Sequence, residues 1–203
     1  MKKAAVIGAG GHTRSLINIL EHNNIGIIGI YDDSYIVSGN EFICGYILKG
    51  KVEDSPEGVD IVLSVGDNDK REALFYKFAP TVLNENLFHP KSFTETKVAW
   101  GVSNQIFAHA YINSEARIGN NNIINTGAII EHEVKMGSHN HISVHATVCG
   151  RVSIGNNCFI GAGAVILDNI IIQNNVTVGA NSVVINNIIE AGVYVGNPVR
   201  RIR

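Results

Sequence analysis

The 203 residues are enough for one large domain or two small ones, and an apolar fraction of 45% suffices for a real core. A net charge of -2 without basic runs gives no electrostatic reason to expect nucleic acid or a membrane surface as a partner. No stretch approaches the roughly 18 uninterrupted apolar residues that span a bilayer, and glycines end the first apolar run too early for export. The three cysteines lack metal-ligand spacing, which favours a reduced, cytoplasmic compartment.

Strands and helices alternate at the start of the chain. Apolar spacing and breaker residues predict, in order, a strand over 3–7, a helix over 12–22, a strand over 25–31, a strand over 60–65 and a helix over 69–78. In the first helix, Leu16, Ile17 and Leu20 are expected to face inward. This order indicates a small βαβ-type domain with a parallel sheet, which we assign to residues 1–85.

The turn between the first strand and the first helix is rich in glycine. Gly8 and Gly10 match the first two glycines of a dinucleotide-binding motif, but Thr13 stands at the third position. Because no second nucleotide-binding half follows, a nicotinamide enzyme is disfavoured. A loop that opens onto a helix N-terminus offers N–H groups to phosphate, so Gly8, Gly10 and Gly11 are expected to bind a nucleoside diphosphate. The alternative is that the glycines serve only the tight turn.

From Ile106 onward, an aliphatic residue occurs at every sixth position without a miss. Neither a helix nor strands joined by hairpins sustain a period of six, whereas a triangular solenoid with three hexads per coil does. Each coil buries its interior by stacking on the next one. We therefore expect a β-solenoid with a C-terminal tail over residues 86–203. The inward series is Ile106, Ile112, Ile118, Ile124, Ile130, Met136, Ile142, Val148, Ile154, Ile160, Ile166, Ile172, Val178 and Val184.

Several short stretches, taken together, resemble the NeuD/PglD family. They are Gly8–His12, Tyr31–Asp33, Asn125–Gly127, Glu131–Glu133 and Gly196–Pro198. The resemblance covers essentially the full chain. It implies an α/β plus β-solenoid fold, in which a small Rossmann-like domain precedes a left-handed parallel β-helix of hexapeptide repeats. The handedness, and assembly as a homotrimer with active sites between subunits, come from the resemblance alone.

The resemblance also implies a reaction, because members of this family acetylate sialic acid or nucleotide-linked 4-amino sugars. We expect an acetyl-CoA-dependent N-acetyltransferase for the 4-amino group of a UDP- or dTDP-linked 4-amino-4,6-dideoxy sugar, in surface polysaccharide or glycan biosynthesis. The glycine-rich turn favours that substrate over the alternative, O-acetylation of sialic acid. The nucleotide itself stays open among UDP, dTDP and GDP. A non-catalytic scaffold is a remote alternative, because several histidines and glutamates interrupt the regular outward face.

Catalytic roles follow from the family by matching position. His132 corresponds to the base, and Glu133 to the carboxylate that orients it. A neutral imidazole, with a pKa near ~6.5, is suited to take a proton from an attacking amine at cytoplasmic pH. Adjacent residues on a flat strand point in opposite directions, so Glu133 reaches His132 only if the chain bends there or the pair forms across a subunit boundary.

The solenoid period adds an oxyanion site. Gly150 follows His132 by one full coil, so it is expected directly over His132, with its N–H available to the developing oxyanion. The resemblance puts Asn125 and His141 beside the acetyl group or the pantetheine arm. It also puts Gly161 and Ala162 on the CoA path, so that the acetyl-CoA-binding set is Asn125, His141, Gly150, Gly161 and Ala162.

The nucleotide sugar is assigned to the N-terminal domain. His12, Asp32 and Asp33 match family positions that contact it, and the glycines of the first turn complete the set. One departure is His145, where related proteins commonly carry glycine, and it leaves the shape of the acyl pocket open.

Metal catalysis is the competing mechanism, since zinc carbonic anhydrases use the same solenoid. Three converging imidazoles are required, but His109 and His145 lie two coils apart with Gly127 between them. At ~4.8 Å per strand they are too distant to share a zinc ion within one chain. We therefore expect no metal.

Overall fold

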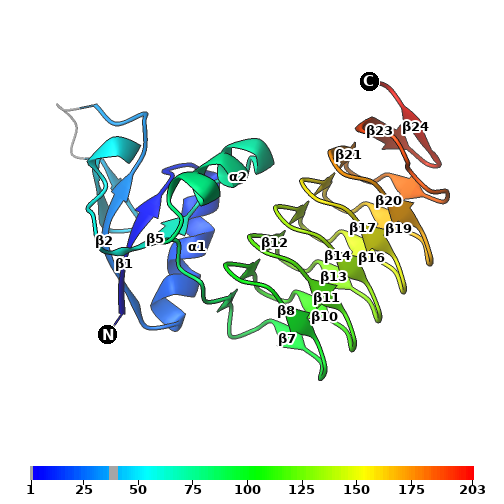
Figure 1. Cartoon of the computed structure of the whole chain (residues 1–203), viewed down its shortest axis with the longest axis horizontal. Coiled ribbons are helices and arrows are strands. Elements are labelled where there is room, and N and C mark those ends of the chain that lie inside the picture. The colour runs from blue at the N-terminus through cyan, green and yellow to red at the C-terminus, as the bar shows by residue number, and fades with distance from the viewer. Residues whose placement is uncertain (1, 37–40) are drawn as a thin grey trace. The chain divides into compact units, whose positions relative to one another are not determined.

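A computed structural model describes residues 2–36 and 41–203. The chain forms two compact units, Met1–His89 and Pro90–Arg203 (Figure 1). Within the described residues, no helix is long and apolar enough to cross a membrane.

The first unit is built on a mixed sheet with the strand order β3-β4-β2-β1-β5. Neighbouring strands are parallel, except for the antiparallel hairpin of β3 and β4. Its elements are β1 (Lys2–Ile7), α1 (Gly11–His22), β2 (Ile25–Tyr31), β3 (Phe42–Ile43), β4 (Tyr46–Gly50), the 3-10 turn η1 (Val52–Asp54), β5 (Asp60–Leu63), α2 (Asn68–Lys77) and β6 (Leu87–Phe88).

The predicted βαβ order is confirmed in this unit. Leu16, Ile17 and Leu20 of α1 are buried, as expected from their spacing. Strand β5 ends two residues earlier than predicted, because Ser64–Asp67 leave the sheet and line a pocket. A cluster of buried side chains forms a hydrophobic core on the sheet. Its members are Ala5, Ile7, Tyr31, Val52, Ile61, Leu63 and Val82.

The second unit is a parallel β-helix whose coils stack regularly in Figure 1. One sheet contains β7 (Phe93–Thr94), β10 (Tyr111–Ile112), β13 (Ile129–Ile130), β16 (Thr147–Val148), β19 (Val165–Ile166) and β22 (Val183–Val184). A second contains β8 (Ala99–Trp100), β11 (Arg117–Ile118), β14 (Lys135–Met136), β17 (Ser153–Ile154) and β20 (Ile171–Ile172). A third contains β9 (Gln105–Ile106), β12 (Ile123–Ile124), β15 (His141–Ile142), β18 (Phe159–Ile160), β21 (Val176–Val178), β23 (Gly192–Gly196) and the antiparallel β24 (Val199–Arg201).

The six-residue period sets the interior of the helix. Every member of the aliphatic series from Ile106 to Val184 is buried, with at most 4% of its surface exposed. The corners use the left-handed backbone region, for instance at Asn121 and Asn157. Several corners place other residues there, including Glu133 and His145, so the solenoid tolerates functional side chains at strained positions.

A ladder of buried asparagines supports one edge of the β-helix. Asn122 accepts the Asn140 N–H at 2.8 Å and donates from its side chain to Asn104 at 2.9 Å. Asn140 in turn accepts the Cys158 N–H at 2.7 Å. The asparagine side-chain oxygens accept hydrogen bonds, in place of water, from backbone N–H groups that have no partner in a neighbouring strand at the corner.

We expect Asn122→Ala to destabilise the fold by about 2–4 kcal/mol, because it removes the acceptor of one buried N–H and the donor to a buried oxygen. Urea denaturation measures the effect. The matched control is Asn156→Ala, which removes an exposed acceptor of the Ser138 N–H that water can replace. An equal loss in both variants would contradict a special role for the buried ladder.

Candidate active site

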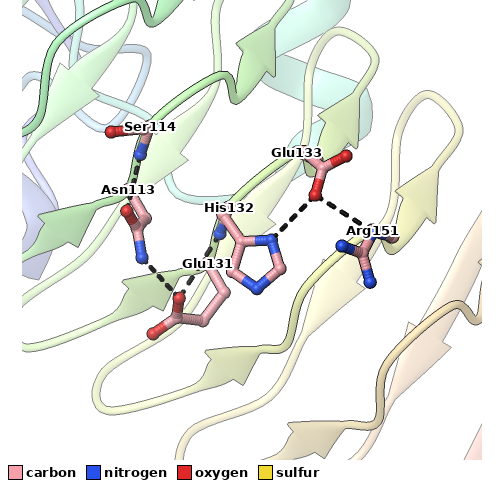
Figure 2. A network of polar contacts seen from close by, with 6 residues as sticks. All are labelled: Asn113, Ser114, Glu131, His132, Glu133 and Arg151. Carbon is pink, nitrogen blue, oxygen red and sulfur yellow. Dashed lines mark hydrogen bonds and ion pairs between the residues drawn. The ribbon is translucent and has the colours of Figure 1, made fainter.

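The corner between β13 and β14 carries His132 and Glu133 (Figure 2). Glu133 has a φ of +61°, so the chain bends there rather than continuing as a flat strand. The bend lets the Glu133 carboxylate meet His132 Nδ1 at 3.0 Å. The pair therefore forms within one chain, by the first of the two routes expected from the sequence.

Glu133 also pairs with Arg151, which lies one coil further on. Arg151 Nε is 3.0 Å from the same Glu133 oxygen that contacts His132. The hydrogen bond from His132, and then the Arg151 charge, hold the pKa of Glu133 below its ordinary value. Glu133 thus stays ionised, and it favours the His132 tautomer that carries its proton on Nδ1 and leaves Nε2 as the acceptor.

A second carboxylate fixes the backbone of the corner. Glu131 accepts from the Asn113 side chain at 2.6 Å and from the His132 N–H at 3.3 Å. On the preceding coil, Asn113 accepts the Ser114 N–H at 2.7 Å. At successive coils of this edge, the first corner residue therefore satisfies the N–H of the next residue (Figure 2).

Gly150 interrupts that arrangement. Its preceding residue is Cys149, and among the residues that the structure describes no group accepts the Gly150 N–H. Gly150 is buried, and the His132 ring lies against it: a methyl group on Gly150 would be 2.6 Å from Cε1 and 2.7 Å from Nε2. The register inferred from the coil length is therefore correct, and an unused backbone donor lies beside the imidazole.

Asn125 and His141 lie at a different corner of the triangle. Asn125 follows β12 and His141 begins β15, and their side chains meet at 3.1 Å. His141 is 8% exposed and packs edge-on against the Phe159 ring at 5.2 Å. Gly161 and Ala162 follow β18 along the same edge. Within one chain, four of the five residues expected to bind acetyl-CoA thus line one edge, whereas Gly150 lies with the catalytic pair on another.

His145 occupies a corner with a φ of +55°. Its ring covers Gly127 so closely that a side chain at Gly127 would collide with it. Gly127 therefore leaves the space that His145 fills. Among the described residues, no group of three or more His, Cys, Asp or Glu side chains is arranged to hold a metal ion.

A pocket of about 710 Å³ in the N-terminal unit collects the predicted nucleotide-binding residues. Its lining includes Gly8, Gly10, Gly11, His12, Asp32 and Asp33, together with the loop of residues 64–67. A side chain at Gly10 or Gly11 would meet no atom within 4 Å, so both glycines border open space. Among the described residues, no side chain caps the start of α1, so that end of the helix is suited to an anion.

Asp32 organises the glycine-rich turn. It accepts the Ala9 N–H at 2.8 Å and the Ser34 N–H at 2.9 Å. Burial opposes ionisation, but these hydrogen bonds bring the pKa of Asp32 below its ordinary value. Asp33 accepts the Val52 N–H at 3.2 Å. Both aspartates therefore shape the pocket through the backbone.

Thr13 explains why the third glycine of a dinucleotide motif is dispensable here. Its hydroxyl is buried and donates to the Gly8 carbonyl at 2.9 Å, and the Ser64 hydroxyl donates to Thr13 at 3.0 Å. Gly8 has a φ of +113°, and a side chain there would strike the Ser64 carbonyl. Gly8 is thus required by the turn, whereas Gly10 and Gly11 are not constrained by contacts.

Arg71 supports the pocket loop of residues 64–67 from behind, and the sequence pattern did not single it out. It is fully buried, and it donates to the carbonyls of Val65 and Gly66 at 3.2 and 3.3 Å and to the Asn68 side chain at 2.9 Å. Burial lowers the pKa of Arg71 to about 10, so the guanidinium remains charged at neutral pH. The only sequence signal was a basic residue on the helix face that turns toward the sheet.

Two family models match the chain. Residues 3–78 match the PglD N-terminal domain, and residues 151–186 match the bacterial transferase hexapeptide repeat. Among curated proteins, an uncharacterised protein of Acanthamoeba polyphaga mimivirus is 32% identical over 120 residues, which are 57% of this chain and 23% of that protein. The chain therefore spans about a quarter of the length of the curated relative that it matches.

Acetyltransferases are among the solved structures that are similar to the whole chain. The acetyltransferase domain of PglB from Neisseria gonorrhoeae is 27% identical with a TM-score of 0.91, over 100% of both chains. PerB from Caulobacter crescentus, in complex with CoA and GDP-perosamine, is 26% identical with a TM-score of 0.91, over 100% of this chain and 98% of its own. The expected fold, a Rossmann-like domain followed by a left-handed β-helix, is confirmed.

Proposed function

We propose that this chain, which belongs to the NeuD/PglD family of hexapeptide-repeat sugar acetyltransferases, transfers an acetyl group from acetyl-CoA to the amino group of a nucleotide-linked amino sugar. The observation that carries the proposal is the His132–Glu133 pair next to Gly150, whose N–H has no acceptor among the described residues. Acyl transfer to an amine needs an oriented general base and a hydrogen-bond donor for the oxyanion close to it.

The steps of acetyl transfer follow from the groups that the corner of His132 provides. The amine nitrogen attacks the thioester carbonyl carbon while His132 Nε2 takes one of its protons. Glu133 stabilises the imidazolium that forms, and the Gly150 N–H stabilises the oxyanion of the tetrahedral intermediate. When the C–S bond breaks, CoA leaves as a thiolate and is protonated, and the imidazolium returns its proton to solvent.

Acetyl-CoA is proposed to lie along the edge of Asn125, His141, Gly161 and Ala162. In a single chain this edge is distinct from that of His132 and Gly150. A second subunit would bring one edge against the other, so we propose a homotrimer with its active sites between subunits. Sedimentation equilibrium tests this assembly, and a monomer with full activity would contradict it.

The pocket of the N-terminal unit is proposed to hold the nucleotide. Its glycine turn presents N–H groups and the start of α1 to a diphosphate. PerB forms a complex with CoA and GDP-perosamine, which supports a nucleotide-linked amino sugar as acceptor. UDP- and dTDP-linked 4-amino-4,6-dideoxy sugars remain our first candidates, in a pathway to a surface polysaccharide or glycan.

The decisive experiment measures CoA thiol release from acetyl-CoA with UDP-, dTDP- and GDP-linked 4-amino sugars and with sialic acid. We expect turnover with one amino sugar. Turnover only with sialic acid would move the enzyme to the alternative, O-acetylation. No release of CoA thiol with any of these acceptors would contradict both enzymatic functions.

We expect Gly11→Leu to raise KM for the nucleotide sugar at least tenfold while the melting temperature and KM for acetyl-CoA stay unchanged. The new side chain meets no protein atom near its Cβ but enters the pocket that the nucleotide needs. Calorimetric titration with the free nucleoside diphosphate measures the loss of binding directly. The contrasting variant Gly8→Ala should instead lower the melting temperature, because that site has neither the space nor the backbone conformation for a side chain. Normal nucleotide affinity in Gly11→Leu would rule out this pocket.

A further inference from the structure

The carboxylate of Asp168 approaches the same space beside Gly150 as the His132 ring. Asp168 lies one coil beyond Gly150, and the coils are joined here by the Asn169 N–H donating to the Gly150 carbonyl at 3.0 Å. A methyl group on Gly150 would be 3.2 Å from Asp168 Oδ1 and 2.7 Å from His132 Nε2. Because Gly150 has no side chain, the His132 imidazole and the Asp168 carboxylate approach the same point from two directions.

The carboxylates near the His132 ring differ in whether they are paired with a cation. The carboxylate of Glu133 is already paired with His132 and Arg151. In contrast, no cation pairs with Asp168 within residues 2–36 and 41–203. Burial, and then the negative charges of Asp168 and Glu131, raise the pKa of the neighbouring Cys149 thiol. The surroundings of His132 and Asp168 thus have a negative potential, which favours a cationic group.

We propose that Asp168 is a substrate-binding residue that holds the acceptor amine as an ammonium ion beside His132 and selects amines over hydroxyls. This inference rests on the proposed acetyl transfer. Both side chains are accessible to solvent, so an ammonium nitrogen that contacts them can donate to Asp168 and lose a proton to His132 Nε2. A hydroxyl is neutral at any pH at which the enzyme works, so it gains little from the carboxylate.

The proton and electron balance is complete with these groups. The ammonium gives its first proton to His132 Nε2, and its lone pair then forms the bond to the thioester carbon. The second proton goes to the CoA thiolate as the C–S bond breaks. One acetyl group moves, and one proton reaches solvent from the imidazolium. During attack, the positive charge resides on the His132 imidazolium, which offsets the charge of Asp168 near the developing oxyanion.

The test compares Asp168→Asn with the wild-type enzyme on the best amino-sugar acceptor, from below to above the pKa of its amine. At pH 7 we expect kcat/KM for the acceptor to fall about tenfold or more, with KM for acetyl-CoA unchanged. As pH rises and the amine loses its charge, the ratio of wild-type to variant should approach one.

The matched control is Glu115→Gln, which neutralises an exposed corner carboxylate on an earlier coil and should change neither constant. A constant wild-type to variant ratio across pH would overturn the role of Asp168, because a purely structural defect does not follow the acceptor charge. A raised KM for acetyl-CoA instead would assign Asp168 to the cofactor. If the wild-type enzyme turns over no acceptor at all, the proposed function itself fails, which is a distinguishable result.

Discussion

We expect His132→Ala to lower kcat about a hundredfold or more with KM for acetyl-CoA retained, because the variant loses the group that takes the proton from the attacking amine. The side chain is 43% exposed, so its removal leaves the stacked interior of the β-helix intact. Steady-state kinetics with both substrates, at a pH near neutrality, measure the effect.

The pH dependence of kcat in His132→Ala identifies the reason for the loss of activity. Above the pKa of the acceptor amine the neutral form attacks without a base, so the activity of His132→Ala should recover as pH rises. His109→Asn is the control, since His109 is an exposed corner histidine with a φ of +60°, a conformation that asparagine tolerates. Near-normal turnover of His132→Ala at neutral pH would place the base elsewhere or show that the acceptor arrives uncharged.

The second large effect is expected at Cys149, through the backbone of the residue that follows it. Asn113 and Asn125 each accept the N–H of the next residue, at 2.7 and 2.8 Å. Cys149→Asn should do the same to the Gly150 N–H and remove the oxyanion donor without altering His132. We expect kcat to fall about tenfold to a hundredfold, with the melting temperature and both KM values close to those of the wild-type enzyme.

Cys149→Ala is the matched control, because it removes the sulfur but offers no acceptor to Gly150. Full activity in Cys149→Ala, with loss in Cys149→Asn, would support the backbone donor. Equal activity of the two variants would mean that the oxyanion is stabilised by another group. Spectroscopic titration of acetyl-CoA binding separates both outcomes from a simple loss of the cofactor.

Periodicity determined most of the C-terminal architecture. A buried aliphatic residue every sixth position is sufficient to require three-sided coils, because only stacking of such coils covers every one of these side chains. The length of a coil then placed Gly150 beside His132 without any structural information. In contrast, the ladder of Asn104, Asn122 and Asn140 is apparent only in the structure, since hydrophobic patterns do not indicate which polar residues point inward.

The sequence alone therefore determined the order of the elements, the interior of the solenoid, the glycine-rich turn and the register of the catalytic corner. It left open how Glu133 reaches His132, because the direction of a corner side chain depends on local φ angles that apolar spacing does not encode. Only the tertiary structure shows that contact and the pairing of Glu133 with Arg151. It also shows the hydrogen bonds of Arg71 to the carbonyls of residues 65 and 66, and the approach of Asp168 to His132. Each joins side chains that meet only after coils stack or a helix packs on its sheet, so the distances between them arise from the fold as a whole.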